Sequence, residues 1–279
     1  MNLIISSLGK SATGNSLLHS RTAFRSEQTA KSVTKDCEMK TNTCMDIHGR
    51  QKKLIVVDTP GFFDSDTSVS NEMVKKKIAS QIFEMTSPGV HAFLILLRID
   101  VRITPEEKDT INFIETIFGK GAAKYCIVVF TRGNLLQENE QTLEEFIQTS
   151  PDLRELVQKC GDRKFAINNK SSDGPLETQT KKLLDMIDRT VESNGRTYYT
   201  NDEYERIEKQ RKEKKAKEEQ EARDKKKAYD DALIAKVIGF YSKDRVLKNT
   251  HFSILGQRRN EKRNAESSKS ANGCNELSS

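Results

Sequence analysis

Four short apolar runs stand out in the first 200 residues of the chain. They cover residues 54–57, 92–97, 126–130 and 164–167 and are rich in Val, Ile, Leu and Phe. Unbroken runs of this kind are typical of strands that helices cover on both sides, because both faces then need apolar side chains. The pattern therefore predicts the strands of a mostly parallel, buried sheet.

Amphipathic segments separate these runs. Their apolar residues recur near a 3.6-residue period, and a Ser, Thr, Asn or Pro precedes each segment, which is typical of helices. The predicted helices cover residues 70–85, 106–118, 143–158 and 177–191. Strands alternating with helices predict a three-layer α/β domain over residues 1–200, with a ligand at the carboxyl ends of the strands.

The pattern changes after Tyr199. Residues 202–229 interleave acidic and basic side chains without Gly or Pro, and Glu precedes Lys by four residues in pairs such as Glu205 and Lys209. Such pairs stabilise a helix. We therefore predict a charged helical extension over residues 201–241 and a disordered tail over 242–279. The apolar residues fill no coiled-coil seam, which favours a solvated single helix over the alternative of a coiled coil.

Composition and charge narrow the class of protein. Hydrophobic residues make up 35% of the 279 and charged residues 32%, and the net charge is +6. The apolar runs are far shorter than the ~20 residues of a membrane span, the first residues lack the features of a secretory signal, and the five cysteines are scattered. We expect a cytoplasmic protein with no transmembrane segment, for which peripheral membrane contact stays open.

The first motif with candidate chemistry is Gly9-Lys10-Ser11. It precedes a predicted helix over residues 12–19, whose unpaired N–H groups and dipole favour a bound phosphate. In such a turn Lys10 can reach the terminal phosphates and Ser11 can bind Mg²⁺. The triplet alone fits an ordinary helix start equally well.

A second motif strengthens the first. Asp58-Thr59-Pro60-Gly61 follows the strand predicted over residues 54–57. An acidic residue at this position can complete the shell of a magnesium ion, and the N–H of Gly61 can contact a γ-phosphate. A plain turn would explain either motif alone, whereas the pair favours a P-loop nucleotide site.

Seven segments, in order, resemble the signatures of the GTPases of immunity-associated proteins (GIMAP), the avirulence-induced type of G domain related to septins and chloroplast import GTPases. They are residues 9–18, 57–64, 87–92, 130–132, 160–163, 168–169 and 194–204. The resemblance implies a Ras-like P-loop G domain that binds GTP or GDP with Mg²⁺ and hydrolyses GTP slowly or on dimerisation. It also implies homodimers or oligomers formed through the G domain, often on membranes, and a role in immunity or cell survival.

The resemblance also assigns roles to single residues. The expected nucleotide ligands are Gly9, Lys10, Ser11, Ala12, Ser26, Asp58, Gly61, Arg132, Gly133, Asn134, Asn168 and Asn169. The expected magnesium ligands are Ser11, Thr34 and Asp58. Residues 132–134 and 168–169 would bracket the base, with Asn169 the firmer choice of the two asparagines. Thr34 fits an exposed loop threonine equally well, and no catalytic residue is assigned.

The start of the chain departs from the family pattern. A complete phosphate loop reads G-x-x-x-x-G-K-[ST], yet Ile4 stands where its first Gly is expected and Ser7 where the family has a further Gly. The strand before the loop is expected to be absent or truncated to a stub at Leu3-Ile4-Ile5. Three explanations stay open: a sequence without its true start, an alternative start, and a degenerate nucleotide site.

Asn134 is the second departure, since the family usually presents Asp or Glu to the guanine. An amide offers one acceptor where a carboxylate offers two, and the lost charge-assisted bond is worth about 1.5 to 3 kcal/mol. We expect weakened guanine selectivity. Furthermore, Phe62, Phe63 and Asp64 follow Gly61, so the Gln that orients water in Ras-like enzymes is missing. Any GTPase activity should therefore be slow.

Three functions follow from these observations. The leading one is a GTP-binding switch with weak or assembly-stimulated hydrolysis. The alternative is a degenerate pseudo-GTPase that acts as an interaction scaffold, which Ile4, Ser7 and Asn134 favour. An electrostatic binder of nucleic acid or membrane is disfavoured, because the basic tail carries interleaved acids and lacks aromatic partners.

Overall fold

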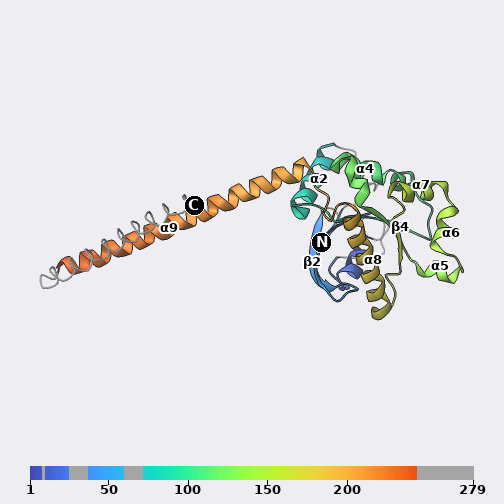
Figure 1. Cartoon of the computed structure of the whole chain (residues 1–279), viewed down its shortest axis with the longest axis horizontal. Helices are drawn as coiled ribbons and strands as arrows, with labels where there is room; N and C mark the ends of the chain where they lie inside the picture. The colour runs from blue at the N-terminus through green and yellow to red at the C-terminus, as the bar shows by residue number, and fades with distance from the viewer. Residues whose placement is uncertain (8–9, 25–36, 60–71, 244–279) are drawn as a thin grey trace, which may run out of the picture. The chain divides into compact units, whose positions relative to one another are not determined.

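The computed structural model describes residues 1–7, 10–24, 37–59 and 72–243 of the chain. Among these residues six strands form one sheet in the order β2-β3-β1-β4-β5-β6 (Figure 1). The neighbours pair in parallel except β2 and β3, which are antiparallel. The strands are β1 (Asn2–Ser7), β2 (Glu38–Met45), β3 (Gln51–Asp58), β4 (Ala92–Arg98), β5 (Cys126–Thr131) and β6 (Lys164–Ile167).

The expectation of an absent or truncated first strand is wrong. Strand β1 runs over six residues at the centre of the sheet, where Leu3 pairs with Val56 of β3 and with Ala92 of β4. Ile4, which the loop consensus would place in the phosphate loop, is a buried core residue. Burial of an aliphatic side chain is worth about 1.5 to 3 kcal/mol, so the run Leu3-Ile4-Ile5 is more stable as a strand than as a loop.

Helices connect the strands. They are α1 (Lys10–Leu17), α2 (Glu72–Thr86), α3 (Pro105–Lys108), α4 (Thr110–Phe118), η1 (Lys120–Tyr125), α5 (Asn134–Glu138), α6 (Leu143–Gln148), α7 (Pro151–Lys159), α8 (Asp173–Ser193) and α9 (Asp202–Lys243). The single helix predicted over 143–158 is corrected to two, α6 and α7. Ser150 caps α7 by accepting the N–H of Leu153, and Pro151 occupies its first turn. Proline is favoured there and cannot continue α6.

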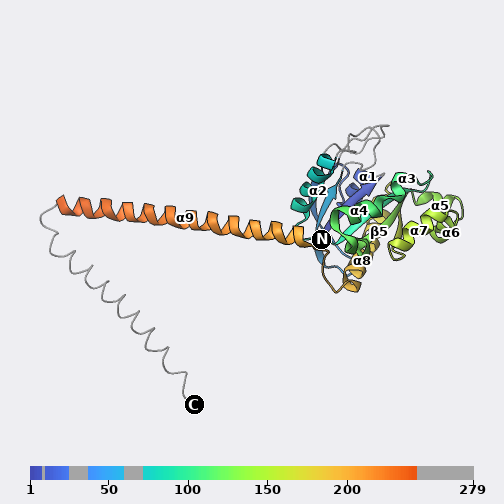
Figure 2. The same ribbon diagram turned by 90° about the horizontal axis from the view of Figure 1, so that it is seen from above.

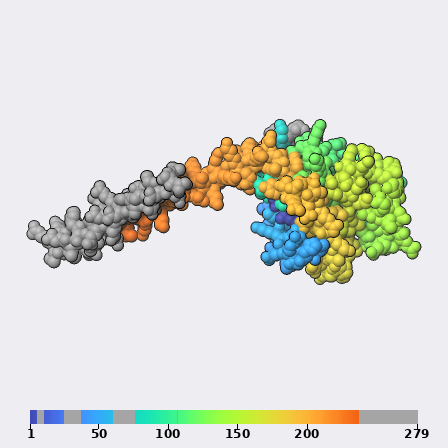
Figure 3. Space-filling model, in the orientation of Figure 1, coloured from blue at the N-terminus to red at the C-terminus, as the bar shows by residue number. Residues whose placement is uncertain are grey.

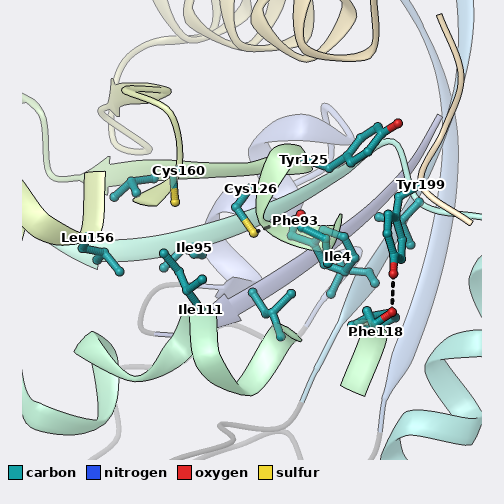
Figure 4. Packing of buried hydrophobic residues seen from close by; sticks show 14 of the residues in the cluster. Ile4, Phe93, Ile95, Ile111, Phe118, Tyr125, Cys126, Leu156, Cys160 and Tyr199 are labelled. Atoms are coloured by element: carbon teal, nitrogen blue, oxygen red, sulfur yellow. Dashed lines mark hydrogen bonds between the residues drawn. The ribbon is translucent and has the colours of Figure 1, made fainter. Parts of the chain in front are cut away.

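Side chains of the sheet alternate between two apolar layers. Ile4, Phe93 and Ile95 belong to the layer under α2, α4 and α7 (Figure 4). Their neighbours Leu3 and Leu94 belong to the opposite layer, with residues of α1 and α8. Helices therefore cover both faces of the sheet, and the predicted three-layer α/β fold is confirmed.

The β2–β3 hairpin is bound to α8 by charged groups. Asp46 is buried at the turn and accepts hydrogen bonds from the backbone of His48 and Arg50 and, at 2.7 Å, from Nε of Arg50. Lys52 of β3 forms an ion pair with Asp188 of α8. Figure 3 shows the hairpin in blue beside the yellow helix α8. The antiparallel edge of the sheet is thus held to the helix layer.

The chain divides into two compact units, Met1–Arg211 and Lys212–Ser279, and α9 (Figure 2) includes residues of both. In the first unit, Tyr204 of α9 is fully buried, and its hydroxyl lies 2.6 Å from Thr86 Oγ1 at the end of α2. In the second unit, the side chains of residues 212–236 are exposed. None of the described helices is both long and apolar enough to span a membrane.

Candidate nucleotide site

The carboxyl ends of β1 and β3 bring the two sequence motifs together. Lys10 begins α1 and is separated from β1 by the two undescribed residues 8 and 9, and Ser11 lies in the first turn. The Oγ of Ser11 donates a hydrogen bond of 2.8 Å to Oδ2 of Asp58, the last residue of β3. Asp58 is 1% exposed. A hydroxyl and a carboxylate from separate elements thus meet at the start of α1.

The segment that leaves β3 is anchored to β1. Oγ1 of Thr59 donates to the carbonyl oxygen of Ile5 at 2.9 Å, and Thr59 is completely buried. This bond fixes the backbone directly after Asp58. The predicted ligands Gly9, Ser26, Thr34 and Gly61 lie outside the described residues, as does the side chain of Lys10.

Arg132, expected beside the base, is held at the end of β5. Its backbone is left-handed, with φ at 62°, a conformation uncommon in residues other than glycine. Its guanidinium pairs with Asp100, which also accepts two hydrogen bonds from Arg98, at 2.9 and 2.6 Å. The bonds from Arg98 hold the pKa of Asp100 below its usual value. The two arginines and Asp100 form a charge cluster at the carboxyl ends of β4 and β5.

Gly133 joins the loop after β5 to the end of β6. Its N–H donates to the carbonyl oxygen of Ile167 at 2.9 Å. A Cβ at this position would lie 3.3 Å from the carbonyl carbon and oxygen of Ile167, so the close approach favours glycine. The two loops expected to bracket a base are therefore adjacent.

Asn134 is the first residue of α5, and its side chain turns along that helix. Its Nδ2 donates to Oε1 of Glu138 at 2.7 Å, and both side chains lie toward solvent. A carboxylate therefore stands beside the amide, one helical turn from the position where the family presents an acidic residue.

The asparagines after β6 are both hydrogen bonded within the protein. Oδ1 of Asn168 accepts the N–H of Lys170 at 3.0 Å, and the N–H of Asn168 donates to Oε1 of Gln179 at 2.8 Å. The amide of Asn169 reaches α1, where it contacts Thr13 and Ser16, each at 2.9 Å. The loop after β6 is thus bound to α1 on one side and to α8 on the other.

Sequence reasoning missed Thr13, Ser16, Gln179 and Asp100. One signal was present for the first two, since both follow Gly9-Lys10-Ser11 at helical spacing and both are polar in a helix that packs on the sheet. Asp100 and Gln179 carried no signal, because their partners are distant in sequence.

The described residues fit magnesium through oxygen ligands. Magnesium in nucleotide sites is usually held by one or two protein oxygens together with substrate phosphates and water, and Ser11 and Asp58 supply a hydroxyl and a carboxylate. The described residues contain no cluster of three or more His, Cys, Asp or Glu arranged for a metal. A groove of about 510 Å³ between α3, α4 and α7 includes none of the predicted ligands.

Comparisons with known proteins agree with this geometry. The profile of the AIG1 family matches residues 5–220. Immune-associated nucleotide-binding protein 7 of Arabidopsis thaliana is 37% identical over 72% of this chain and 63% of its own length. Human GTPase IMAP family member 8 is 31% identical over 69% of this chain and 27% of its own length. The chain thus spans less than two thirds of either relative.

Among solved structures, Toc33 of Arabidopsis thaliana in complex with GDP and Mg²⁺ is similar, with a TM-score of 0.50 and 18% identity over 72% of this chain and 88% of Toc33. At this identity the likeness concerns the fold, and it supports the Ras-like G-domain architecture. The family match extends through the described site and most of the sheet. The chain therefore belongs to the AIG1 family, and the resemblance to immunity-associated GTPases is confirmed.

Proposed function

We propose that this chain binds a guanine nucleotide together with Mg²⁺ and acts as a G-domain switch. The contact between Ser11 Oγ and Asp58 Oδ2, at 2.8 Å, carries the proposal. A hydroxyl at a helix start and a buried carboxylate at the end of the neighbouring strand are the protein oxygens that P-loop proteins offer to the magnesium of a bound nucleotide. The bound ion would neutralise charge on the phosphates.

Guanine is the base that the relatives support. One relative is named a nucleotide-binding protein, another a GTPase, and the similar Toc33 structure contains GDP and Mg²⁺. In this chain Gly133 bonds to Ile167 and so brings residues 132–134 beside residues 168–169. These two loops are the place we propose for the base.

Hydrolysis is expected to be slow and to depend on assembly. Phe62, Phe63 and Asp64 directly follow Gly61, so the Gln that orients the attacking water in Ras-like proteins is missing at this place. We propose that a second copy supplies the missing group across a homodimer of G domains. Turnover per chain should then rise with protein concentration, and a turnover independent of concentration would contradict this part of the proposal.

A fluorescent-nucleotide titration tests the binding proposal. Mant-GDP is added with and without Mg²⁺ to the full chain and to the variants Ser11→Ala and Asp58→Asn. Each variant removes one oxygen ligand and should weaken magnesium-dependent binding at least tenfold. Ser193→Ala, at the far end of α8, is the matched control and should bind like the parent. Parent-like binding by both site variants would refute the proposed site.

A scaffold without nucleotide is the second candidate function. Strand β1 extends to Ser7 and α1 begins at Lys10. Residues 4 to 7, which are the first four positions of the loop consensus, therefore belong to a strand rather than to a nest of N–H groups around a phosphate. The same titration separates the two candidates. A folded chain that binds no mant-GDP at millimolar magnesium would favour the scaffold, and saturable binding would exclude it.

A further inference from the structure

The side chain of Asn169 is hydrogen bonded to two hydroxyls of α1. Its Nδ2 donates to Oγ1 of Thr13, and its Oδ1 accepts from Oγ of Ser16, both at 2.9 Å. Thr13 is completely buried and Ser16 is 6% exposed. Because these residues are three apart on a helix, their side chains share one face.

The rest of the loop is held from the opposite side by α8. Gln179 accepts the N–H of Asn168 at 2.8 Å, and its Nε2 donates to Oγ of Ser171 at 3.2 Å. Asn168 closes the turn onto the N–H of Lys170. Among the described residues, Asn169 makes the hydrogen bonds that join this loop to α1.

A base-binding role for the Asn169 amide would require it to leave α1. Turning it away would break both bonds and leave the buried hydroxyl of Thr13 without its hydrogen bond to Asn169. An unsatisfied buried polar group costs about 1 to 3 kcal/mol. The opposite arrangement, in which the amide stays on α1, keeps all three side chains bonded. The geometry therefore disfavours Asn169 as a direct ligand of the base.

We propose that Asn169 is a positioning residue, and that Thr13 and Ser16 use it to hold the base-side loop on the helix that starts at the phosphate site. This inference rests on the proposed function and goes beyond it. Ser11 and Ser16 belong to the same short helix, so the phosphate and base ends of the site share one rigid support. Guanine selectivity then depends on residues that never contact the base.

The test compares base selectivity among matched variants. Thr13→Val and Ser16→Ala each remove one hydroxyl that bonds to Asn169, and Asn169→Ala removes the amide itself. Ser16→Thr keeps a hydroxyl at position 16. Thr178→Val is the control, because Thr178 bonds only within α8. Affinities for mant-GDP and mant-ADP are measured for each. We expect the GDP-to-ADP preference to fall three- to tenfold in the first three variants and to be retained in Ser16→Thr and Thr178→Val.

A different pattern would overturn the inference. If Asn169→Ala lost selectivity while Thr13→Val and Ser16→Ala kept it, Asn169 would contact the base directly. If none of the three changed the ratio, the loop would not depend on α1.

Hydrogen exchange of the nucleotide-free chain separates failure of this inference from failure of the proposed function. Exchange of residues 168–171 should be faster in Ser16→Ala and Thr13→Val than in the parent and in Thr178→Val. Faster exchange would support the role of Thr13 and Ser16 in holding the loop even if the parent bound no nucleotide. Equal exchange in all variants would overturn the inference that Thr13 and Ser16 hold the loop through Asn169, whatever the nucleotide affinity.

Discussion

Asn134 carries an amide where the family usually has a carboxylate, and its nearest polar partner is Glu138. The bond of 2.7 Å between them is at the protein surface. An amide accepts from only one of the two donors on the guanine edge at a time. In the proposed site, the affinity for guanine would therefore depend partly on a single side-chain atom.

Asn134→Asp should tighten GDP binding. A carboxylate restores a charge-assisted pair with the base, worth about 1.5 to 3 kcal/mol or roughly one to two decades in affinity. Glu138 one turn away would repel the new charge, so the double variant Asn134→Asp with Glu138→Gln should gain more than the single one. Calorimetry with GDP and Mg²⁺ measures both, and an unchanged Kd in the double variant would place the base elsewhere.

The place of a single residue in the fold can be predicted best where the local sequence decides it. The place of Asp58 at the end of β3 could be predicted because an acidic residue follows an apolar run, whereas its role as a ligand stays a prediction. The partners of Asn169 could not be predicted in this way. Thr13 and Ser16 lie about 150 residues before it, and polar positions on a helix look solvent-exposed until the helix packs against a loop.

Among the elements, strands β3 to β6 were predictable because each is an unbroken apolar run. Strand β2 was missed since within it only Cys44 is buried, as befits an edge strand with one polar face. Strand β1 was misjudged for another reason. The loop consensus competed with the strand propensity of Leu3-Ile4-Ile5 for the same residues, and burial between two strands decided in favour of the strand.

The start of α9 behaves as part of the globular unit. Tyr204 packs edge-to-face on Phe83 of α2 with ring centroids 4.7 Å apart, and Tyr199 bonds through its hydroxyl to the carbonyl oxygen of Phe118 (Figure 4). Arg211 donates to the carbonyl oxygen of Glu84 at 2.5 Å. These contacts join the first turns of α9 to α2, and the segment just before α9 to the end of α4.

Tyr204→Ala should destabilise the unit Met1–Arg211 by about 3 to 5 kcal/mol, because truncating a buried aromatic side chain leaves a cavity. The matched control is Tyr229→Ala, since Tyr229 lies on the same helix and is 69% exposed. Urea denaturation followed by far-UV circular dichroism gives both values. Equal midpoints for the two variants would show that the start of α9 does not stabilise the globular unit.

For the whole molecule, pH is expected to act through His91 at the amino end of β4. Its Nδ1 accepts the backbone N–H of Asn2 at 3.0 Å, so that nitrogen carries no proton in the folded chain. Burial lowers the pKa of His91 to about 4, with a further lowering by the amino terminus and Lys52 and an opposing effect of Asp188. The unfolded chain therefore takes up this proton first as pH falls.

The contribution of His91 to folding stability should be fully present above pH 6.5. As pH falls from 6.5 toward 4, the free energy of unfolding should decrease by up to about 3 kcal/mol because of this residue. His91→Gln removes the titrating ring while offering an oxygen acceptor to Asn2. The difference in unfolding free energy between parent and variant, measured in urea from pH 4.5 to 8, should shift in favour of the variant at low pH. A constant difference would contradict the assignment.

The central position of β1 also affects how the chain is made. Leu3 pairs with Ala92, about 90 residues later, and synthesis adds roughly 5 to 20 residues per second. On the order of 5 to 20 s therefore pass between the appearance of this strand and that of its second partner. During this interval at least one edge of an aliphatic strand is unpaired, and a chaperone that binds such segments would protect the nascent chain from aggregation.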